Sequence, residues 1–291
     1  FVFQRGLTTG TVADNTAPQV LTISPPDGAL PVGINANIRV RFNEPINPLS
    51  VNGTTILVSD GVHTSMPSSI SFTNNNQDVV IVPHAPLPEA TQLTLKVEGV
   101  EDLSGNAVVP QTTHFTTGAG PDLTRAQVTR TNPFNGATNV PVNTLITIEV
   151  NEPIDPSTVT NNTFIVRDNS TGQNVAGTLS VSPNGRVITF MPNAPLAVGR
   201  TYSVFFSFQG ILDLAGNFIE GSNIFFNTSF ASDTTAPQVV AISPANGLSA
   251  VPINAAVTIQ FNEPVQSFSV DQVTLSTGGV NVNVIRSLSN S

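Results

Sequence analysis

The sequence predicts an all-β protein built from antiparallel β-sandwiches in tandem, and three observations support this prediction. The first is an Asn-Glu-Pro motif that recurs at Asn43–Pro45, Asn151–Pro153 and Asn262–Pro264. Its asparagines are 108 and 111 residues apart (151 − 43 and 262 − 151). Such spacing indicates whole modules in tandem rather than a short-period solenoid. The other two observations are strands of period two and frequent turn signals.

The clearest strand leads into each copy of the motif. Over residues 36–42 apolar residues alternate with asparagine and arginine, and residues 146–150 and 255–261 repeat the alternation. A period of two with one apolar face indicates a strand packed on a core on one side only. The proline of the motif ends that strand, because it has no N–H to donate to a sheet.

Six further short strands are expected in each complete module. One follows the linker and stops at a turn rich in proline, asparagine and glycine, such as residues 24–28 or 132–136. The others are expected at Thr55–Val58, Ser69–Phe72, Val79–Val82, Gln92–Val97 and Thr112–Phe115, with second-module counterparts at Phe164–Val166, Gly177–Val181, Val187–Phe190, Tyr202–Phe208 and Ile224–Phe226. No window shows helical spacing, and 23 prolines would interrupt most helices. About seven strands per ~100 residues is typical of a β-sandwich.

The repeats divide the chain into four parts. Residues 1–13 are expected to be the last strand of a preceding module plus a linker; residues 14–121 and 122–232 are complete modules, and residues 233–291 are the N-terminal half of a third. Truncation of a longer polypeptide is the favoured explanation of the partial modules. Donation of a strand between neighbouring molecules is the alternative.

Composition excludes several classes of function. The net charge is −9 with only 10% charged residues, and the few basic residues form no stripe, which argues against nucleic-acid binding. No apolar run is long enough to span a membrane. The absence of cysteine excludes thiol catalysis, cysteine-ligated metal and disulfides. No nucleophile motif of the Gly-x-Ser-x-Gly type is present, so we expect no enzyme.

Five motifs follow one another in order in the first module: the linker Ala17–Val20, the turn Pro25–Gly28, the strand that ends in Asn-Glu-Pro, Pro83–Leu87 and Asp102–Asn106. The last four recur in order in the second module, where Arg125-Ala126 replaces Ala-Pro in the linker. This order of motifs resembles that of bacterial Ig-like modules of the S-layer type (SbsA-like, or Big_5). The resemblance covers residues 14–291 and implies tandem immunoglobulin-like sandwiches of a prokaryotic extracellular or cell-surface protein.

The recurring glutamate is the best candidate for a role beyond packing. In an Ig-like sandwich, the incoming linker, the loop after the Asn-Glu-Pro strand and the loop before the last strand lie at one end. This topology predicts two groups of oxygen ligands at module junctions: Asp14, Glu44, Asp102 and Asn106, and then Asp122, Glu152, Asp213 and Asn217. Carboxylate and amide oxygens suit Ca²⁺, which is the one cofactor this arrangement suggests. The alternative is structural: the glutamate accepts backbone N–H bonds, and the Asp and Asn residues only shape a turn.

The function expected from these observations is structural. A non-enzymatic spacer, surface-layer subunit or filament scaffold on the cell surface fits the repetition, the short linkers and the low charge. Its partners would be neighbouring modules of the same chain or of identical chains, including self-assembly. The alternative is an adhesin segment that binds a glycan or a protein through its module loops.

Overall fold

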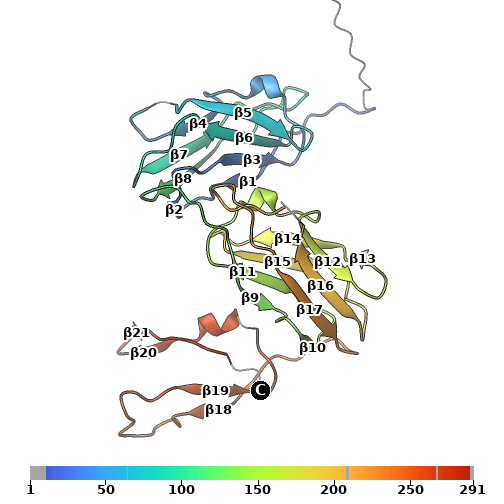
Figure 1. The fold of residues 1–291 in the computed structure, drawn as a ribbon, viewed down its shortest axis with the longest axis vertical. Helices are drawn as coiled ribbons and strands as arrows, with labels where there is room; N and C mark the ends of the chain where they lie inside the picture. Colours follow the sequence, from blue (N-terminus) through green and yellow to red (C-terminus); the bar gives the residue numbers. More distant parts are fainter. Residues whose placement is uncertain (1–10, 64, 208–209, 267, 289–291) are drawn as a thin grey trace, which may run out of the picture.

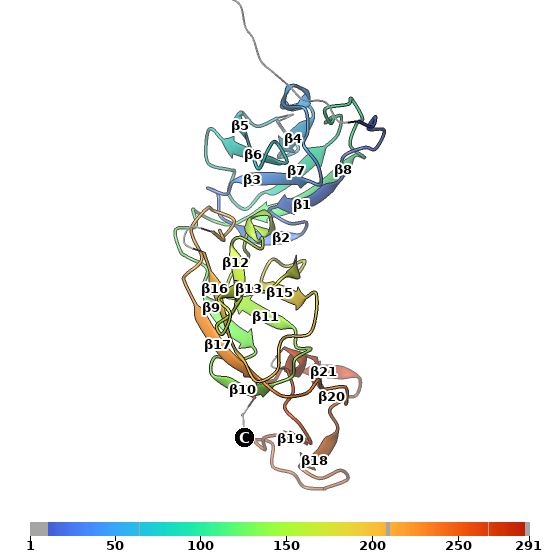
Figure 2. The same ribbon diagram turned by 90° about the vertical axis from the view of Figure 1, so that its right-hand side faces the viewer.

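The computed structural model describes residues 11–288 except 64, 208–209 and 267. It forms three successive bodies along one elongated axis (Figure 1, Figure 2). We call them module 1 (residues 14–121), module 2 (residues 122–232) and module 3 (residues 233–291). The strand expected at residues 1–10 lies outside the described residues.

Module 1 is a sandwich of two four-stranded sheets. The first has the order β1 (Val20–Ser24), β3 (Ile38–Phe42), β6 (Asp78–Pro83) and β5 (Ser68–Thr73). The second has the order β2 (Ala29–Val32), β8 (Gln111–Thr117), β7 (Gln92–Val97) and β4 (Ile56–Ser59). Apolar side chains from both sheets, among them Val40, Ile81, Leu95 and Phe115, form one buried core between them. The sandwich predicted from the period-two pattern is therefore confirmed.

Module 2 repeats this arrangement with one added strand. Its first sheet has the order β14 (Gly177–Val181), β15 (Val187–Pro192), β11 (Ile146–Val150) and β9 (Val128–Asn132). Its second has the order β10 (Ala137–Val140), β17 (Asn223–Thr228), β16 (Thr201–Phe206), β12 (Phe164–Asp168) and β13 (Gln173–Asn174). The core is aromatic at its centre, where the Phe164 and Phe190 rings stack with centroids 6.0 Å apart. The Tyr202 hydroxyl accepts a hydrogen bond from the Ala197 amide at 2.8 Å, which ties β16 to the preceding loop.

Module 3 contains two hairpin-like pairs, β18 (Val239–Ser243) with β19 (Thr258–Phe261) and β20 (Leu275–Thr277) with β21 (Val280–Val282). The pairing of β18 with β19 has the register of β1 with β3, because Val239 faces Phe261 as Val20 faces Phe42. Three short 3-10 helices complete the described elements: η1 (Pro48–Ser50), η2 (Pro156–Thr158) and η3 (Ser269–Gln272). None of the described helices is long and apolar enough to cross a membrane.

One feature of the sheets differs from the expectation. Strand β2 pairs in parallel with β8, and β10 pairs in parallel with β17, in sheets that are otherwise antiparallel. Sequence alternation did not reveal β2, since its four residues include the proline Pro31 and both ends are buried. These parallel pairs bring the end of each complete module beside the loop that precedes its Asn-Glu-Pro strand. The Gly118 amide donates to the Val32 carbonyl there at 2.8 Å.

Substitution in the core of module 2 tests the packing. Phe190→Ala is expected to lower the unfolding free energy of module 2 by about 3–5 kcal/mol, because the buried ring is replaced by a cavity. Phe225→Ala is the matched control, since that ring is 42% exposed, and should cost less than about 1 kcal/mol. Denaturant titration followed by hydrogen exchange of the β11 and β15 amides measures both. Equal losses in the two variants would contradict the assigned core.

Candidate functional site: acidic clusters and contacts at the module joints

The first predicted group of acidic residues does come together. Asp14, Glu44 and Asp102 each offer one carboxylate oxygen, and the three oxygens lie within 4.8 Å of one another. Asp14 belongs to the linker, Glu44 follows β3, and Asp102 follows β7, so the cluster joins three separate stretches of chain. It lies at the end of module 1 that faces away from module 2.

The second group repeats this geometry at the joint between modules 1 and 2. Asp122, Glu152 and Asp213 also bring three carboxylate oxygens within 4.8 Å of one another. A cleft of about 330 Å³ beside the cluster is lined by Asp122, Glu152 and by Leu214 and Arg186. Two matching clusters, 108 to 111 residues apart in sequence, show that the topology of the module produces the site.

The two asparagines of the predicted groups brace the clusters. The Asn106 side-chain amide donates to Asp102 Oδ2 at 2.7 Å, and its backbone amide donates to Asp102 Oδ1 at 2.9 Å. Asn217 makes the same contacts with Asp213, at 2.9 Å in each case. These bonds close the Asp-x-x-Gly-Asn turn, as the structural interpretation expects. They also aim the two carboxylates, so the turn and the cluster are one unit.

The glutamates have few partners of their own. The Thr124 hydroxyl lies 3.5 Å from Glu152 Oε2, and the equivalent Thr235 hydroxyl donates to Glu263 Oε2 at 3.1 Å. Glu152 Oε1 and Glu263 Oε1 are buried and have no hydrogen-bond partner among the described residues. The backbone N–H bonds that the structural interpretation assigns to the glutamate are thus not found at Glu152 within the described part of the chain.

Burial and neighbouring charge perturb these carboxyl groups. Desolvation, with the charges of Asp122 and Asp213 next in size, raises the pKa of Glu152 to about 7. Desolvation also raises the pKa of Asp213. In the outer cluster the pKa of Glu44 is raised by desolvation and by Asp14 and Asp102. Burial raises the pKa of Asp102 as well, but hydrogen bonds from Asn106 and Ser104 outweigh it and the net shift is downward.

Three carboxylates at this distance fit a hard divalent cation. Calcium takes six to eight oxygen ligands at about 2.3–2.6 Å, and mono- or bidentate carboxylates with water supply such a shell. Neither cluster contains the histidine or cysteine that softer metals prefer. A cation would also neutralise the repulsion by Asp122 and Asp213 that adds to desolvation in raising the pKa of Glu152.

A second set of contacts at the same joint was not predicted from the sequence. The Asn35 side chain forms two hydrogen bonds with the backbone of Asp122, each 2.8 Å long. Asn143 holds the backbone of Asp233 in the same way at the next joint, at 2.8 and 3.3 Å. We call this pair of bonds the asparagine clasp. Its sequence signal was available, because an asparagine stands at the equivalent positions 35, 143 and 254.

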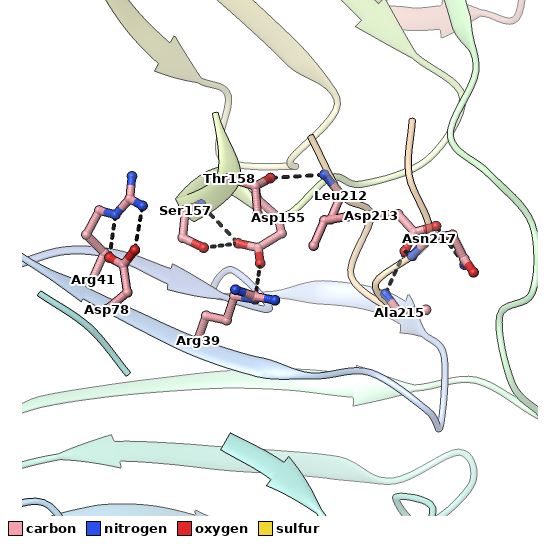
Figure 3. Close-up of polar contacts among 10 residues, drawn as sticks. All are labelled: Arg39, Arg41, Asp78, Asp155, Ser157, Thr158, Leu212, Asp213, Ala215 and Asn217. Atoms are coloured by element: carbon pink, nitrogen blue, oxygen red, sulfur yellow. Dashed lines mark hydrogen bonds and ion pairs between the residues drawn. The ribbon is translucent and has the colours of Figure 1, made fainter. Parts of the chain in front are cut away.

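Module 2 also reaches across to β3 and the core of module 1. Arg39 Nε lies 2.9 Å from Asp155 Oδ2, and the Asp155 side chain is only 4% exposed (Figure 3). Asp155 caps η2 by accepting from the Ser157 amide and hydroxyl at 2.9 and 2.6 Å. The Asn37 amide donates to the Leu214 carbonyl at 3.2 Å, and the Leu214 side chain belongs to the buried core of module 1. The joint is therefore a packed interface and not a free hinge.

The ion pair across the joint yields one prediction. Asp155→Asn keeps the side-chain cap of η2 but leaves the Arg39 guanidinium without its carboxylate, so docking of the two modules should weaken by about 1–3 kcal/mol. Faster hydrogen exchange at the Asn37 amide measures the loss. Arg39→Thr combined with Asp155→Asn leaves no stranded charge and should recover most of it. A double variant as weak as the single one would contradict the assignment.

The raised pKa of Glu152 yields a second prediction, for protein free of divalent cations. Folded module 2 holds the Glu152 proton up to about pH 7, whereas the unfolded chain loses it near pH 4.5. Stability should therefore fall as pH rises from about 4.5 to about 7, by on the order of 1 kcal/mol after solvent screening is considered.

Melting of the protein with chelator between pH 4.5 and 8 measures this dependence. Glu152→Gln should flatten the profile, because the variant has no proton to lose at this position. A wild-type profile that is already flat, or one that rises with pH across this range, would exclude the titration of Glu152 as its cause.

Comparison with known proteins gives a family. A model described as bacterial Ig-like domain (Big_5) matches residues 14–117, 122–228 and 233–291. No curated protein matches the chain.

Several solved structures are similar at low sequence identity. CopC from Methylosinus trichosporium OB3b is 20% identical, with 36% of this chain and 94% of that chain covered and a TM-score of 0.30. Domains 1–6 of the surface layer protein SbsC are 11% identical over 85% of this chain and 46% of that chain, with a TM-score of 0.30. An L,D-transpeptidase from Mycobacterium smegmatis is 16% identical over 57% of this chain and 62% of that chain, with a TM-score of 0.28. This chain thus spans less than half of the S-layer chain.

The family model covers nearly all of residues 14–291, in three segments that begin at the three linker aspartates. The chain belongs to the bacterial Ig-like domain family, as a tandem array of its modules.

Proposed function

We propose that this chain is a non-enzymatic structural region of an extracellular or cell-surface protein, of the surface-layer (SbsA-like) type, that spaces or scaffolds through rigidly joined modules. The packed joint between modules 1 and 2 is the observation that supports it most. A spacer transmits position only if its joints resist bending, and the asparagine clasp, the Arg39–Asp155 pair and the buried Leu214 each oppose rotation.

Rigidity of the joint is the property to measure. Paired spin labels on β5 and β15 should give one narrow distance distribution, because neither module moves against the other. Asn35→Ala with Leu214→Ser removes the clasp and the apolar contact and should broaden that distribution. A broad distribution in the unaltered chain would contradict the scaffold. Specific binding on a glycan array would instead favour the adhesin alternative.

Calcium at the two acidic clusters is the second part of the proposal. The buried Oε1 of Glu152, which lies beside two further carboxylates and has no hydrogen-bond partner among the described residues, supports it. A cation there would link the linker, the Asn-Glu-Pro strand and the Asp-x-x-Gly-Asn turn, and so stiffen the joint. Asp14, Glu44 and Asp102 would hold the first ion, and Asp122, Glu152 and Asp213 the second, with Asn106 and Asn217 orienting the ligands.

Titration calorimetry tests the calcium proposal. The chain should bind two Ca²⁺ ions, with dissociation constants near the 10⁻⁴–10⁻³ M of extracellular modules, and its melting temperature should rise in calcium relative to chelator. Glu152→Gln should retain one ion, bound at the outer cluster. Asp60→Asn, which alters a carboxylate outside both clusters, is the control and should retain two. No heat of binding and no thermal shift in the unaltered chain would overturn the calcium proposal and leave the scaffold proposal standing.

A further inference from the structure

Module 1 exposes the surface that module 2 buries. Leu214 of module 2 is 6% exposed against module 1, whereas its counterpart Leu103 is 71% exposed. Ser157 is 3% exposed, whereas its counterpart Leu49 is 91% exposed at the equivalent position of η1. Large apolar side chains are thus exposed at both positions at the outer end of module 1 in the described part of the chain.

The linker at that end has the conformation of the two joints that are formed. The Thr16 amide and hydroxyl donate to Asp14 Oδ1 at 3.0 and 2.7 Å. Thr124 makes these bonds with Asp122, also at 3.0 and 2.7 Å, and Thr235 makes them with Asp233 at 2.9 and 2.8 Å. The backbones of Asp122 and Asp233 are each held by an asparagine clasp from the preceding module. Asp14 therefore presents its backbone as a joint requires.

We propose that this face of module 1, formed by Asp14, Asn47, Leu49 and Leu103, docks the end of another bacterial Ig-like module joined to it through the Asp14 linker. The joint between modules 1 and 2 supplies the docking geometry. Leu103 would enter the apolar end of the partner's core as Leu214 enters that of module 1. An asparagine of the partner, at the position of Asn35, would hold the backbone of Asp14.

The chemistry of the face also specifies the partner's strand. Asn47 stands where module 2 has Asp155, and it caps η1 through Oδ1, which accepts from the Leu49 amide at 3.1 Å. Because Asn47 is neutral, it offers no carboxylate to a partner arginine at the position equivalent to Arg39. The fitting partner has a neutral residue at that position, as module 2 has in Thr147, together with a clasp asparagine such as Asn143.

A fusion protein in which a module takes the place of residues 1–13 tests the proposal. Residues 122–232, which carry Asn143 and Thr147, are placed directly ahead of residue 14 of the chain. Because the chain contains no cysteine, a single Leu49→Cys or Leu103→Cys change gives a clean thiol reporter. Leu49→Cys is the milder change, since cysteine resembles the buried Ser157 of the formed joint in size.

Val109→Cys is the matched control. Val109 is 68% exposed, and its module 2 counterpart, Glu220, stays exposed in the formed joint. Both reporters should label at least about tenfold more slowly in the fusion than in the unfused chain, while the control labels at one rate in both. Equal reporter rates in the two proteins would overturn the proposal.

Two further arms identify the occupant. Protection of either reporter in the unfused chain that increases with protein concentration would show that a second copy occupies the face, which also overturns the proposal. In a fusion led by residues 14–121, Arg39 faces Asn47, so protection should be weaker and Asn47→Asp should restore it. The docking proposal rests on the proposed scaffold function. If docking at the outer face fails, the spin-label distance distribution between modules 1 and 2 should still be narrow. Failure of the docking proposal is therefore distinguishable from failure of the scaffold proposal.

Discussion

The fixed backbone of the linker aspartate is the constraint on which the joint depends. A chain that passes from one sandwich to the next with few residues between them must satisfy its backbone N–H and C=O groups without a sheet. The Asn35 side chain does so for Asp122 with one amide group, which donates and accepts at 2.8 Å. Once the Asp122 backbone is held, its carboxylate lies beside Glu152 and Asp213. The clasp thus fixes the linker that supplies one carboxylate of the cluster, whereas the topology of the module places the other two.

The same constraint explains why the Asn-Glu-Pro motif recurs. The Asn151 side chain accepts from the Gln127 amide at 2.7 Å, as Asn43 does from Gln19 and Asn262 from Gln238, so the asparagine fixes the linker to the strand end. The proline ends pairing, and the glutamate between them is left at the joint with two aspartates. At this position charge repulsion and burial are unavoidable for a carboxylate. A glutamine would fill the same space without a charge, so the energetic cost of a glutamate at this position supports a role such as cation binding.

Sequence reasoning located what the module topology alone determines. Glu44, Asp102 and Asp14 could be placed together because an Ig-like sandwich brings three known loops to one end, and the structure brings the carboxylates together there. It did not find the Arg39–Asp155 pair or the burial of Leu214, because these depend on the angle between two modules, which no period or motif encodes. Leu103 and Leu214 occupy the same motif and differ only in what covers them. Strand β2 was missed because its four residues include Pro31 and are buried at both ends, so they show no alternation.

Differences between the modules at otherwise equivalent positions indicate how order along the array is specified. The asparagine clasp is present at both joints and therefore cannot tell one neighbour from another. The pair Arg39–Asp155 can, since either charge without the other would be stranded in a poorly solvated interface. The linker makes modest contacts sufficient, because it holds the two faces at a high effective concentration. The shared clasp therefore fixes the linker at both joints, and the charged pairs that differ between them, Arg39–Asp155 and Arg130–Asp271, distinguish one neighbour from another.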